Sequence, residues 1–236
     1  MKIAIVTLYT PDLLTPAFIS KRLPNLRSYA NKHGYYLKEY KKNLDKNRDP
    51  QWSKIKAVFN VLKTGEFDWI FWCDADTLFL DKERKIESFI DPNFNFIFCS
   101  DLSSTLWINT GAFLVKNTSY SLQFLKKIYY DDNYYARQKT EFDHEQGSLR
   151  ELLYEDRRNE KIKITETEDS NERFQHFWYM NDPEPLFKRD DNYFSKEKLN
   201  LNLTYSPGDF LVHFAGCDNE DTLYRKFTSL KNNGVL

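Results

Sequence analysis

Cysteine is scarce in this 236-residue chain, and the three that occur, Cys73, Cys99 and Cys217, form an odd set at unrelated spacings. A disulfide framework and a thiolate zinc site both need paired or clustered cysteines, so the sequence favours neither. A reducing compartment is the simplest setting for such a chain. We therefore expect a cytoplasmic protein, at most peripheral at a membrane.

Long hydrophobic runs are also missing. The apolar start at residues 2–8 is too short for the core of a signal peptide, and no small-residue cleavage site follows it. No stretch contains the roughly 20 consecutive apolar residues that a transmembrane helix needs. We expect no transmembrane anchor.

An excess of charge of one sign is likewise absent. The chain has 34 Lys and Arg against 35 Asp and Glu, a formal net charge of -1. Nucleic-acid binding depends on a basic surface facing the phosphates, so we expect no nucleic-acid partner. The hydrophobic fraction of 41% and the aromatic fraction of 17% are ample for a packed core.

Strand and helix patterns alternate along the first half of the chain. Short apolar runs predict strands at residues 2–8, 35–40, 68–73, 94–99, 105–115, 161–165 and 210–214. Helical spacing predicts helices at residues 15–31, 52–65, 117–130, 147–153 and 221–230. This alternation is typical of an α/β fold with a largely parallel sheet covered by helices on both faces. Residues 168–206 show no clean periodicity.

Two carboxylates follow the buried strand at residues 68–73, namely Asp74 and Asp76 in Asp74-Ala75-Asp76. Carboxylates this close repel each other unless a cation lies between them. Hard oxygen ligands are what Mg²⁺ and Mn²⁺ prefer in proteins. One alternative is a plain turn whose carboxylates cap the next element, because Asp-x-Asp alone is a weak motif.

A histidine ends the last predicted strand. His213 is followed by Ala215 and Gly216, small residues that allow the backbone to approach a ligand closely. A lone histidine is more often structural. However, ligands of α/β folds gather at the carboxyl ends of strands, where Asp74 and Asp76 also emerge. Carboxylates with one imidazole suit Mn²⁺.

Three further segments have polar residues where a site is expected. Lys54 lies at the start of an amphipathic helix and is a candidate partner for a phosphate or a carboxylate. The Asn109-Thr110-Gly111 segment interrupts a strand, either as a β-bulge or where a sugar approaches closely. Glu145-Gln146 begins a helix whose first turn presents a carboxylate or an amide, while Asp143 is an alternative N-cap.

Taken in order, these segments resemble glycosyltransferase family 34, which contains yeast galactosyl- and mannosyltransferases and plant xyloglucan xylosyltransferases. The resemblance covers about residues 52–217. It rests on Trp-x-Lys, Asp-Ala-Asp, Ile-Asn-Thr-Gly-Ala-Phe-Leu-Val-Lys-Asn, Glu-Gln and Gly-Asp-Phe-Leu-Val-His-Phe-Ala-Gly-Cys. The glycogenin-like transferases of family 8 share part of this layout, but they usually continue from His-x-x-Gly into Lys-Pro-Trp. Here Gly216 is followed by Cys217 and Asp218.

The resemblance implies a GT-A fold, a nucleotide-diphosphate sugar as donor, a Mn²⁺ cofactor with Mg²⁺ as the alternative, and retention of the anomeric configuration. It implies Asp74, Asp76 and His213 as the metal site. Around the donor it implies Thr7, Tyr9, Lys54, Asp74, Asn109, Thr110 and Gly216. Gln146 and Asp101 are implied as the catalytic groups near the anomeric carbon. We expect one GT-A domain over residues 1–236, with a donor-binding half at about 1–100 and an acceptor half at about 101–236.

The leading hypothesis is thus a metal-dependent retaining glycosyltransferase that moves a hexose or pentose to a glycan, a lipid-linked or a protein acceptor. One alternative is a haloacid-dehalogenase-like phosphatase, because Asp74-Ala75-Asp76-Thr77 fits Asp-x-Asp-x-Thr with Asp74 as the nucleophile. That motif normally lies on the first strand of its fold. The other alternative is a non-catalytic protein that binds nucleotide sugars.

Overall fold

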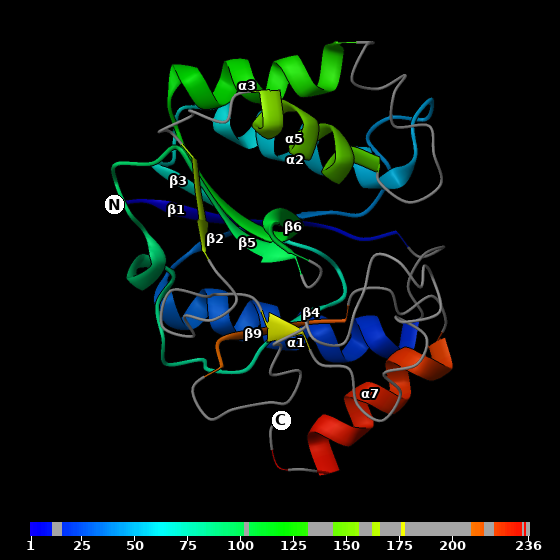
Figure 1. The fold of residues 1–236 in the computed structure, drawn as a ribbon. Helices are drawn as coiled ribbons and strands as arrows, with labels where there is room; N and C mark the ends of the chain where they lie inside the picture. The colour runs from blue at the N-terminus through cyan, green and yellow to red at the C-terminus, as the bar shows by residue number, and fades with distance from the viewer. Residues whose placement is uncertain are drawn as a thin grey trace.

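The computed structural model describes residues 1–10, 16–101, 104–131, 144–155, 162–165, 176–177, 209–214, 220–232 and 234. Its centre is a six-stranded sheet in the order β2-β1-β3-β6-β5-β7 (Figure 1). The strands are β1 (Ile3–Leu8), β2 (Tyr36–Tyr40), β3 (Trp69–Cys73), β5 (Phe96–Asp101), β6 (Ser104–Lys116) and β7 (Ile162–Thr165).

The sheet is mixed but mostly parallel, as predicted. Strand β1 is parallel to β2 and β3, and β5 is parallel to β7. Strand β6 runs antiparallel to both of its neighbours, β3 and β5. Because Cys73 at the end of β3 is opposite Ala112, the residues of β6 that precede Ala112 lie beside the turn that follows β3.

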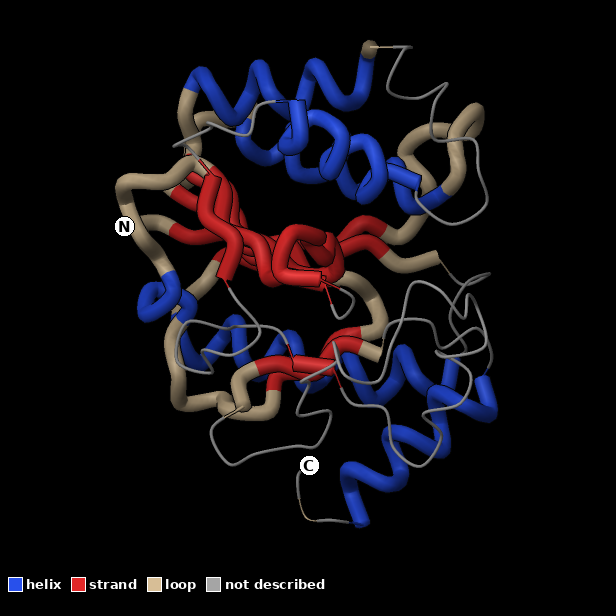
Figure 2. Tube along the Cα trace, in the orientation of Figure 1, coloured by secondary structure: helices blue, strands red, loops and turns tan. Residues whose placement is uncertain are grey.

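Helices cover both faces of this sheet, which confirms the α/β prediction (Figures 1 and 2). Helices α2 (Ser53–Leu62), α3 (Ser119–Tyr130) and α5 (His144–Glu155) lie on one face, and α1 (Pro16–His33) lies on the other. The alternation of side chains along β1 fits this arrangement. Ala4 and Val6 pack in the core with α2 and α3, whereas Ile3 and Ile5 pack in the core with α1.

Helix α3 shows how local sequence sets an element. Thr118 is its N-cap, and the Thr118 hydroxyl accepts a hydrogen bond from the backbone N–H of Ser121. Leu125 and Ile128 are buried, as the helical spacing predicts. Leu122, predicted to face inward as well, is only partly buried at the edge of the core.

A second, three-stranded sheet was not predicted. It consists of β4 (Thr77–Phe79), β9 (Leu211–His213) and β8 (His176–Phe177) in the order β4-β9-β8. The sequence predicts the strand near residue 211 but gives no sign that this strand pairs antiparallel with a short strand directly after Asp76. With only three residues each, β4 and β9 are too short to show a periodicity.

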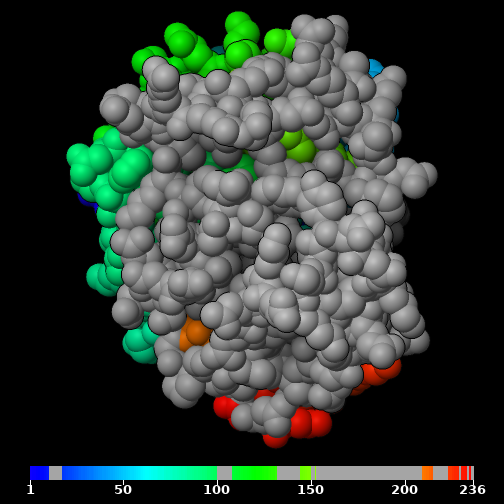
Figure 3. All heavy atoms as spheres, in the orientation of Figure 1, coloured from blue at the N-terminus to red at the C-terminus, as the bar shows by residue number. Residues whose placement is uncertain are grey.

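Helix α7 (Glu220–Asn232) and α1 pack near this smaller sheet, and Phe18, Leu78, Val212 and Leu223 share one apolar cluster. Two short 3-10 helices, η1 (Pro50–Trp52) and η2 (Ile86–Phe89), complete the described elements. The space-filling view shows one face of the molecule, with α3 at its upper end and α7 at its lower end (Figure 3). None of the described helices has the length and apolar character required to span a bilayer.

Candidate active site

The turn after β3 carries Asp74 and Asp76 and joins the two sheets. The backbone N–H of Asp74 donates to the carbonyl of Gly111 on β6 at 2.7 Å, and the N–H of Phe214 donates to the carbonyl of Asp76 at 2.9 Å. The turn is therefore held to the large sheet at Asp74 and, at Asp76, to the residue that directly follows β9.

His213 ends β9 directly opposite Thr77, the first residue of β4. Its Nε2 lies 3.3 Å from Oδ1 of Asp76. One ligand atom each from Asp74, Asp76 and His213 can be chosen so that all lie within 4.8 Å of one another. Residues remote in sequence thus meet as the sequence analysis expected. Two carboxylates and one imidazole match the ligand preference of Mn²⁺, so the residues fit such an ion.

The electrostatics of this pair favour a charged contact. Burial works against the charged form of Asp76, but attraction to His213 and the hydrogen bond between them outweigh it and hold the pKa of Asp76 below its ordinary value. Burial also disfavours the charged imidazole, yet Asp76 raises the pKa of His213. A metal ion would replace the proton of this imidazole, because only the neutral ring can act as a ligand.

Lys54 lies at the centre of a buried polar network. Its Nζ is 2.8 Å from Oε1 of Glu145 and 3.1 Å from Oδ2 of Asp74. It also donates to the carbonyl of Thr110 at 2.9 Å. Burial lowers the pKa of Lys54, but the two carboxylates outweigh this and keep it above the ordinary value, so the ammonium stays charged.

Both oxygens of the Asp74 carboxylate are already hydrogen-bonded. The indole Nε1 of Trp72 donates to Oδ1 at 2.7 Å, and Lys54 donates to Oδ2. Burial raises the pKa of Asp74, and nearby Asp76 adds to the rise, while Lys54 opposes it. The position of this side chain is thus set by two donors from different elements.

The pairing of β6 with β5 shifts its register at the interruption, as the β-bulge alternative predicts. Phe98 of β5 pairs with Phe113, but the next residue, Cys99, pairs with Asn109. The extra residues of β6 arch toward the turn at Asp74. The Asn109 side chain stabilises the arch, because its Oδ1 accepts a hydrogen bond from the N–H of Gly111 at 2.7 Å.

The first turn of α5 reaches this bulge. The N–H of Thr110 donates to Oε1 of Gln146 at 3.0 Å, and Oγ1 of Thr110 lies 2.9 Å from Oε1 of Glu145. Glu145 is buried, whereas Gln146 is partly exposed. The first turn of α5 therefore joins the network of Lys54, with the Gln146 amide oxygen held against the backbone of β6.

The remaining predicted residues are placed as follows. The hydroxyl of Thr7, at the end of β1, is fully buried and accepts a hydrogen bond from Arg22 at 2.7 Å. The hydroxyl of Tyr9 lies 3.4 Å from Oε2 of Glu39. The side chain of Asp101 and the whole of Asp143 and Gly216 are outside the described residues.

Arg22 is the buried group that sequence analysis missed. It is 1% exposed and bonds to the backbone of the Asp74 turn. The signal was present, because Phe18, Arg22, Leu26 and Tyr29 follow one another at helical spacing along the buried face of α1. A charged residue within the apolar face of a helix indicates a buried charge that polar partners must stabilise.

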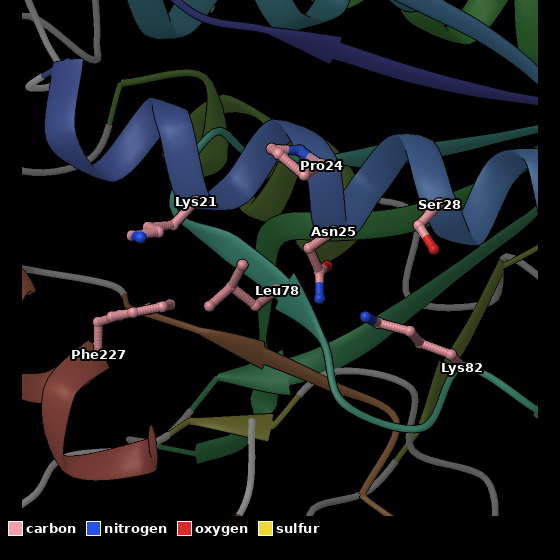
Figure 4. A pocket seen from close by; sticks show the side chains of 7 residues that line it. All are labelled: Lys21, Pro24, Asn25, Ser28, Leu78, Lys82 and Phe227. Carbon is pink, nitrogen blue, oxygen red and sulfur yellow. The ribbon is translucent and has the colours of Figure 1, made fainter. Parts of the chain in front are cut away.

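One pocket of about 400 Å³ lies elsewhere, on the outer side of α1 and β4 (Figure 4). Lys21, Asn25, Leu78, Lys82 and Phe227 line it, and none of the predicted site residues does. The amide of Asn25 is already bonded to both backbone groups of Phe79. This pocket is separate from the carboxylate and histidine cluster.

Comparison with protein families gives a match over more than half of the chain. Residues 26–173 match the family described as "Protein of unknown function, DUF273". Among curated proteins, xyloglucan 6-xylosyltransferase 4 of Arabidopsis thaliana is 30% identical over 115 residues, which covers 46% of this chain and 22% of that protein. An uncharacterized alpha-1,2-galactosyltransferase of Schizosaccharomyces pombe is 26% identical over 141 residues, covering 43% of this chain and 36% of that protein.

Solved structures resemble nearly the whole chain. The glycosyltransferase involved in glycosylation of the major capsid of PBCV-1 aligns with a TM-score of 0.60 at 16% identity, covering 97% of this chain and 100% of that one. The galactosyltransferase LgtC, solved with donor and acceptor sugar analogues, aligns with a TM-score of 0.55 at 12% identity over 98% and 95% of the two chains. At these identities the likeness shows the fold, which is the GT-A fold that the resemblance implied.

Proposed function

Since this chain belongs to the DUF273 family and has the GT-A fold, we propose that it is a metal-dependent glycosyltransferase. It transfers a sugar from a nucleotide-diphosphate donor to a hydroxyl group of a glycan or of another acceptor. The matches to a xylosyltransferase and a galactosyltransferase support this class of reaction. The chain spans between 22% and 36% of the length of these two relatives.

The observation that carries the proposal is the meeting of Asp74, Asp76 and His213 within 4.8 Å. The acids come from the carboxyl end of β3, and the imidazole comes from the carboxyl end of β9. Strand ends of this kind are where α/β folds bind their ligands. A cluster of two acids and one imidazole, contributed by two different sheets, supports a cation site for a diphosphate donor.

In the proposed arrangement Asp76 and His213 hold a divalent cation, Mn²⁺ or Mg²⁺, with Asp74 beside it. The bound ion would supply charge neutralisation for the departing diphosphate. Lys54 opposes the rise in the pKa of Asp74 and holds the carboxylate in place, because its ammonium lies 3.1 Å from Oδ2. Tyr9, Asn109, Thr110 and Gly216 are proposed to line the donor, whereas Thr7, which the resemblance also placed there, is fully buried and bonded to Arg22.

Gln146 is proposed to face the anomeric carbon of the donor sugar, with Asp101 nearby. As the bond from this carbon to the phosphate oxygen breaks, the carbon gains positive character, which an amide oxygen or a carboxylate stabilises. The acceptor hydroxyl then attacks from the face of the departing phosphate, whose oxygen takes the proton. This order of events retains the anomeric configuration.

Glu145 is a poor candidate for a covalent nucleophile in this reaction. Its Oε1 is 2.8 Å from the ammonium of Lys54 and 2.9 Å from the hydroxyl of Thr110, and the side chain is buried. A buried carboxylate that is paired with an ammonium is a weak nucleophile, because the cation stabilises its negative charge. This supports direct transfer within the retaining mechanism.

The phosphatase alternative is disfavoured by the same geometry. It requires Asp74 to be an available nucleophile on the first strand of the fold. Asp74 instead follows β3, and both of its oxygens accept hydrogen bonds, from Trp72 and from Lys54. The solved structures of the same fold are named glycosyltransferases.

The test is a thermal-shift screen of nucleotide sugars with and without Mn²⁺, followed by a transfer assay with the stabilising donor. We expect a donor-specific rise in the melting temperature only when metal is present. Asp76→Asn should abolish that rise and the metal-dependent turnover while the variant stays folded. Turnover of Asp76→Asn at the wild-type rate with the metal chelated would contradict the proposal. Binding of donor without hydrolysis or transfer across a broad acceptor panel would favour a non-catalytic role.

A further inference from the structure

Arg22 carries a full positive charge into the interior of the protein. It projects from the inner face of α1 and is 1% exposed. Among the described residues no carboxylate lies within ion-pair distance of its guanidinium, and its Nε and Nη1 have no hydrogen-bond partner there. Burial of a charge costs several kcal/mol unless specific contacts offset it. The contacts that Arg22 does make are therefore informative.

The hydrogen bonds between Arg22 and the described part of the chain all come from one nitrogen and meet at the metal-site turn. Nη2 of Arg22 is 2.7 Å from Oγ1 of Thr7 and 3.0 Å from the carbonyl oxygen of Asp74, with Sγ of Cys73 at 3.7 Å. Arg22 thus ties the end of β1 to the end of β3 and to the first residue of the turn. The same Asp74 carbonyl accepts a hydrogen bond from the hydroxyl of Thr77 at 2.7 Å.

This carbonyl is a sensitive point in the fold. The turn from Asp74 to Asp76 leaves the large sheet and enters β4 of the small sheet, and His213 belongs to the small sheet. A rotation of the peptide after Asp74 would move the Asp76 side chain relative to the His213 imidazole, which now lies 3.3 Å away. Donors from α1 and from β4 hold that peptide from two sides.

We infer that Arg22 is a positioning residue for the divalent-cation site: it fixes the Asp74 carbonyl so that Asp76 and His213 stay together. The inference rests on the proposed function, since it concerns the cation site assigned there. Arg22 does not contact the ion or the donor in this account. It acts through the backbone of the turn.

Charge and position have opposite effects on metal affinity, which makes the inference testable. A buried cation close to a cation site repels the ion, so the loss of that charge alone strengthens metal binding. The loss of the hydrogen bond to Asp74 weakens metal binding by letting the turn move. A decrease in affinity on removal of Arg22 therefore reports its positioning role and not its charge.

The experiment measures Mn²⁺ binding to the metal-free protein, from the electron paramagnetic resonance signal of the free ion. The variants are Arg22→Gln, Arg22→Lys and Lys21→Gln, the last a matched loss of charge at the neighbouring exposed residue of α1, which lines the outer pocket (Figure 4). We expect Mn²⁺ binding at least about tenfold weaker for Arg22→Gln, by about the free energy of one hydrogen bond to a charged donor. Arg22→Lys should also bind more weakly, because one ammonium on a shorter stem does not reach both oxygens. Lys21→Gln should match wild type.

An Arg22→Gln protein that is folded and binds Mn²⁺ as tightly as wild type, or more tightly, overturns the inference. Near-ultraviolet circular dichroism and thermal melts establish the folded state. If both Arg22 variants unfold, Thr77→Val removes the other donor to the same carbonyl with little change in shape, and unchanged affinity in that variant is the overturning result. A wild-type protein that does not bind Mn²⁺ would instead refute the proposed cation site.

Discussion

Gly111 and His213 are in direct contact across the two sheets. A β-carbon built on Gly111 would lie 2.1 Å from Cε1 and 2.3 Å from Nδ1 of the imidazole. Real β-carbons do not approach other atoms this closely, so a side chain at position 111 excludes the present position of the ring. One interpretation of this segment was the close approach of a sugar. The group that the structure places against Gly111 is an imidazole of the same chain.

The first prediction concerns this contact. Gly111→Ala should displace the His213 ring, destabilise the protein by about 1–3 kcal/mol through overpacking and weaken Mn²⁺ binding. Denaturant unfolding and Mn²⁺ titration measure the two effects. The double variant Gly111→Ala/His213→Ala should regain most of the stability, because the ring is gone, but not the metal binding. If Gly111→Ala alone keeps wild-type stability and metal affinity, the described contact is wrong.

The second prediction concerns Lys54. Lys54→Met leaves the buried carboxylates of Asp74 and Glu145 without their cation and should destabilise the protein by about 3–5 kcal/mol at neutral pH. Burial and nearby Asp76 already raise the pKa of Asp74, and the loss of Lys54 raises it further, so the folded variant binds a proton more readily than the unfolded chain. The difference in the free energy of unfolding between Lys54→Met and wild type should therefore become smaller as the pH falls. Urea unfolding at neutral and at mildly acidic pH measures this.

Lys56→Met is the matched control for that experiment. Lys56 lies on the same helix and donates to the carbonyl of Leu44, but it is only partly buried. The Lys56→Met variant should lose about 1 kcal/mol of stability or less, and the pH dependence of its stability should stay close to that of wild type. An equal deficit in the two variants would show that Lys54 has no special role.

A third prediction concerns Trp72. Trp72→Phe keeps an aromatic ring in the core but removes the donor to Oδ1 of Asp74. A hydrogen bond to a carboxylate contributes about 1.5–3 kcal/mol, so the variant should lose stability of this order. The freed carboxylate should also raise the KM for the donor more than it lowers kcat. Trp69→Phe, on the opposite face of the same strand, should leave KM unchanged, and a KM effect of equal size there would argue against the role of the Trp72 hydrogen bond.

The fourth prediction is a pH dependence of stability that arises at Glu39. Nε and Nη2 of Arg27 each donate to a carboxylate oxygen of Glu39 at 2.8 Å. The hydrogen bond from Arg27 holds the pKa of Glu39 below its ordinary value of 4.5, although burial opposes this. A carboxyl with a depressed folded pKa stabilises the protein above the unfolded pKa, and this stabilisation is lost as the pH falls through the folded pKa.

Arg27→Gln should remove this dependence. Because Arg27 is about half exposed, the difference at neutral pH should be small, about 1 kcal/mol or less, and it should shrink in high salt. Thermal melts between about pH 3 and pH 7 measure it, and the curves of variant and wild type should converge at the acid end. Curves that stay parallel over the whole range would contradict the assignment to Glu39.

The local sequence pattern is enough to predict several secondary-structure elements of this protein. The apolar run before Asp74 predicts β3 and so places Asp74 and Asp76 just beyond the carboxyl end of that strand. The spacing of Leu125 and Ile128 after Thr118 predicts α3 and its N-cap. These features depend on neighbours in the chain, since a strand alternates every second residue and a helix repeats every 3.6. The ordered motifs also implied the GT-A fold, which the structural comparisons confirm.

Other parts depend on pairing between distant segments, which no local pattern encodes. That His213 ends a separate small sheet, that Gly111 must lack a side chain to admit its ring, and that Arg22 reaches the turn at Asp74 all follow from strand register and helix placement. A shift of one residue in the pairing of β4 with β9 would turn His213 to the other face of the sheet. The sequence alone thus identifies the candidate residues, but only the tertiary packing brings them together into one site.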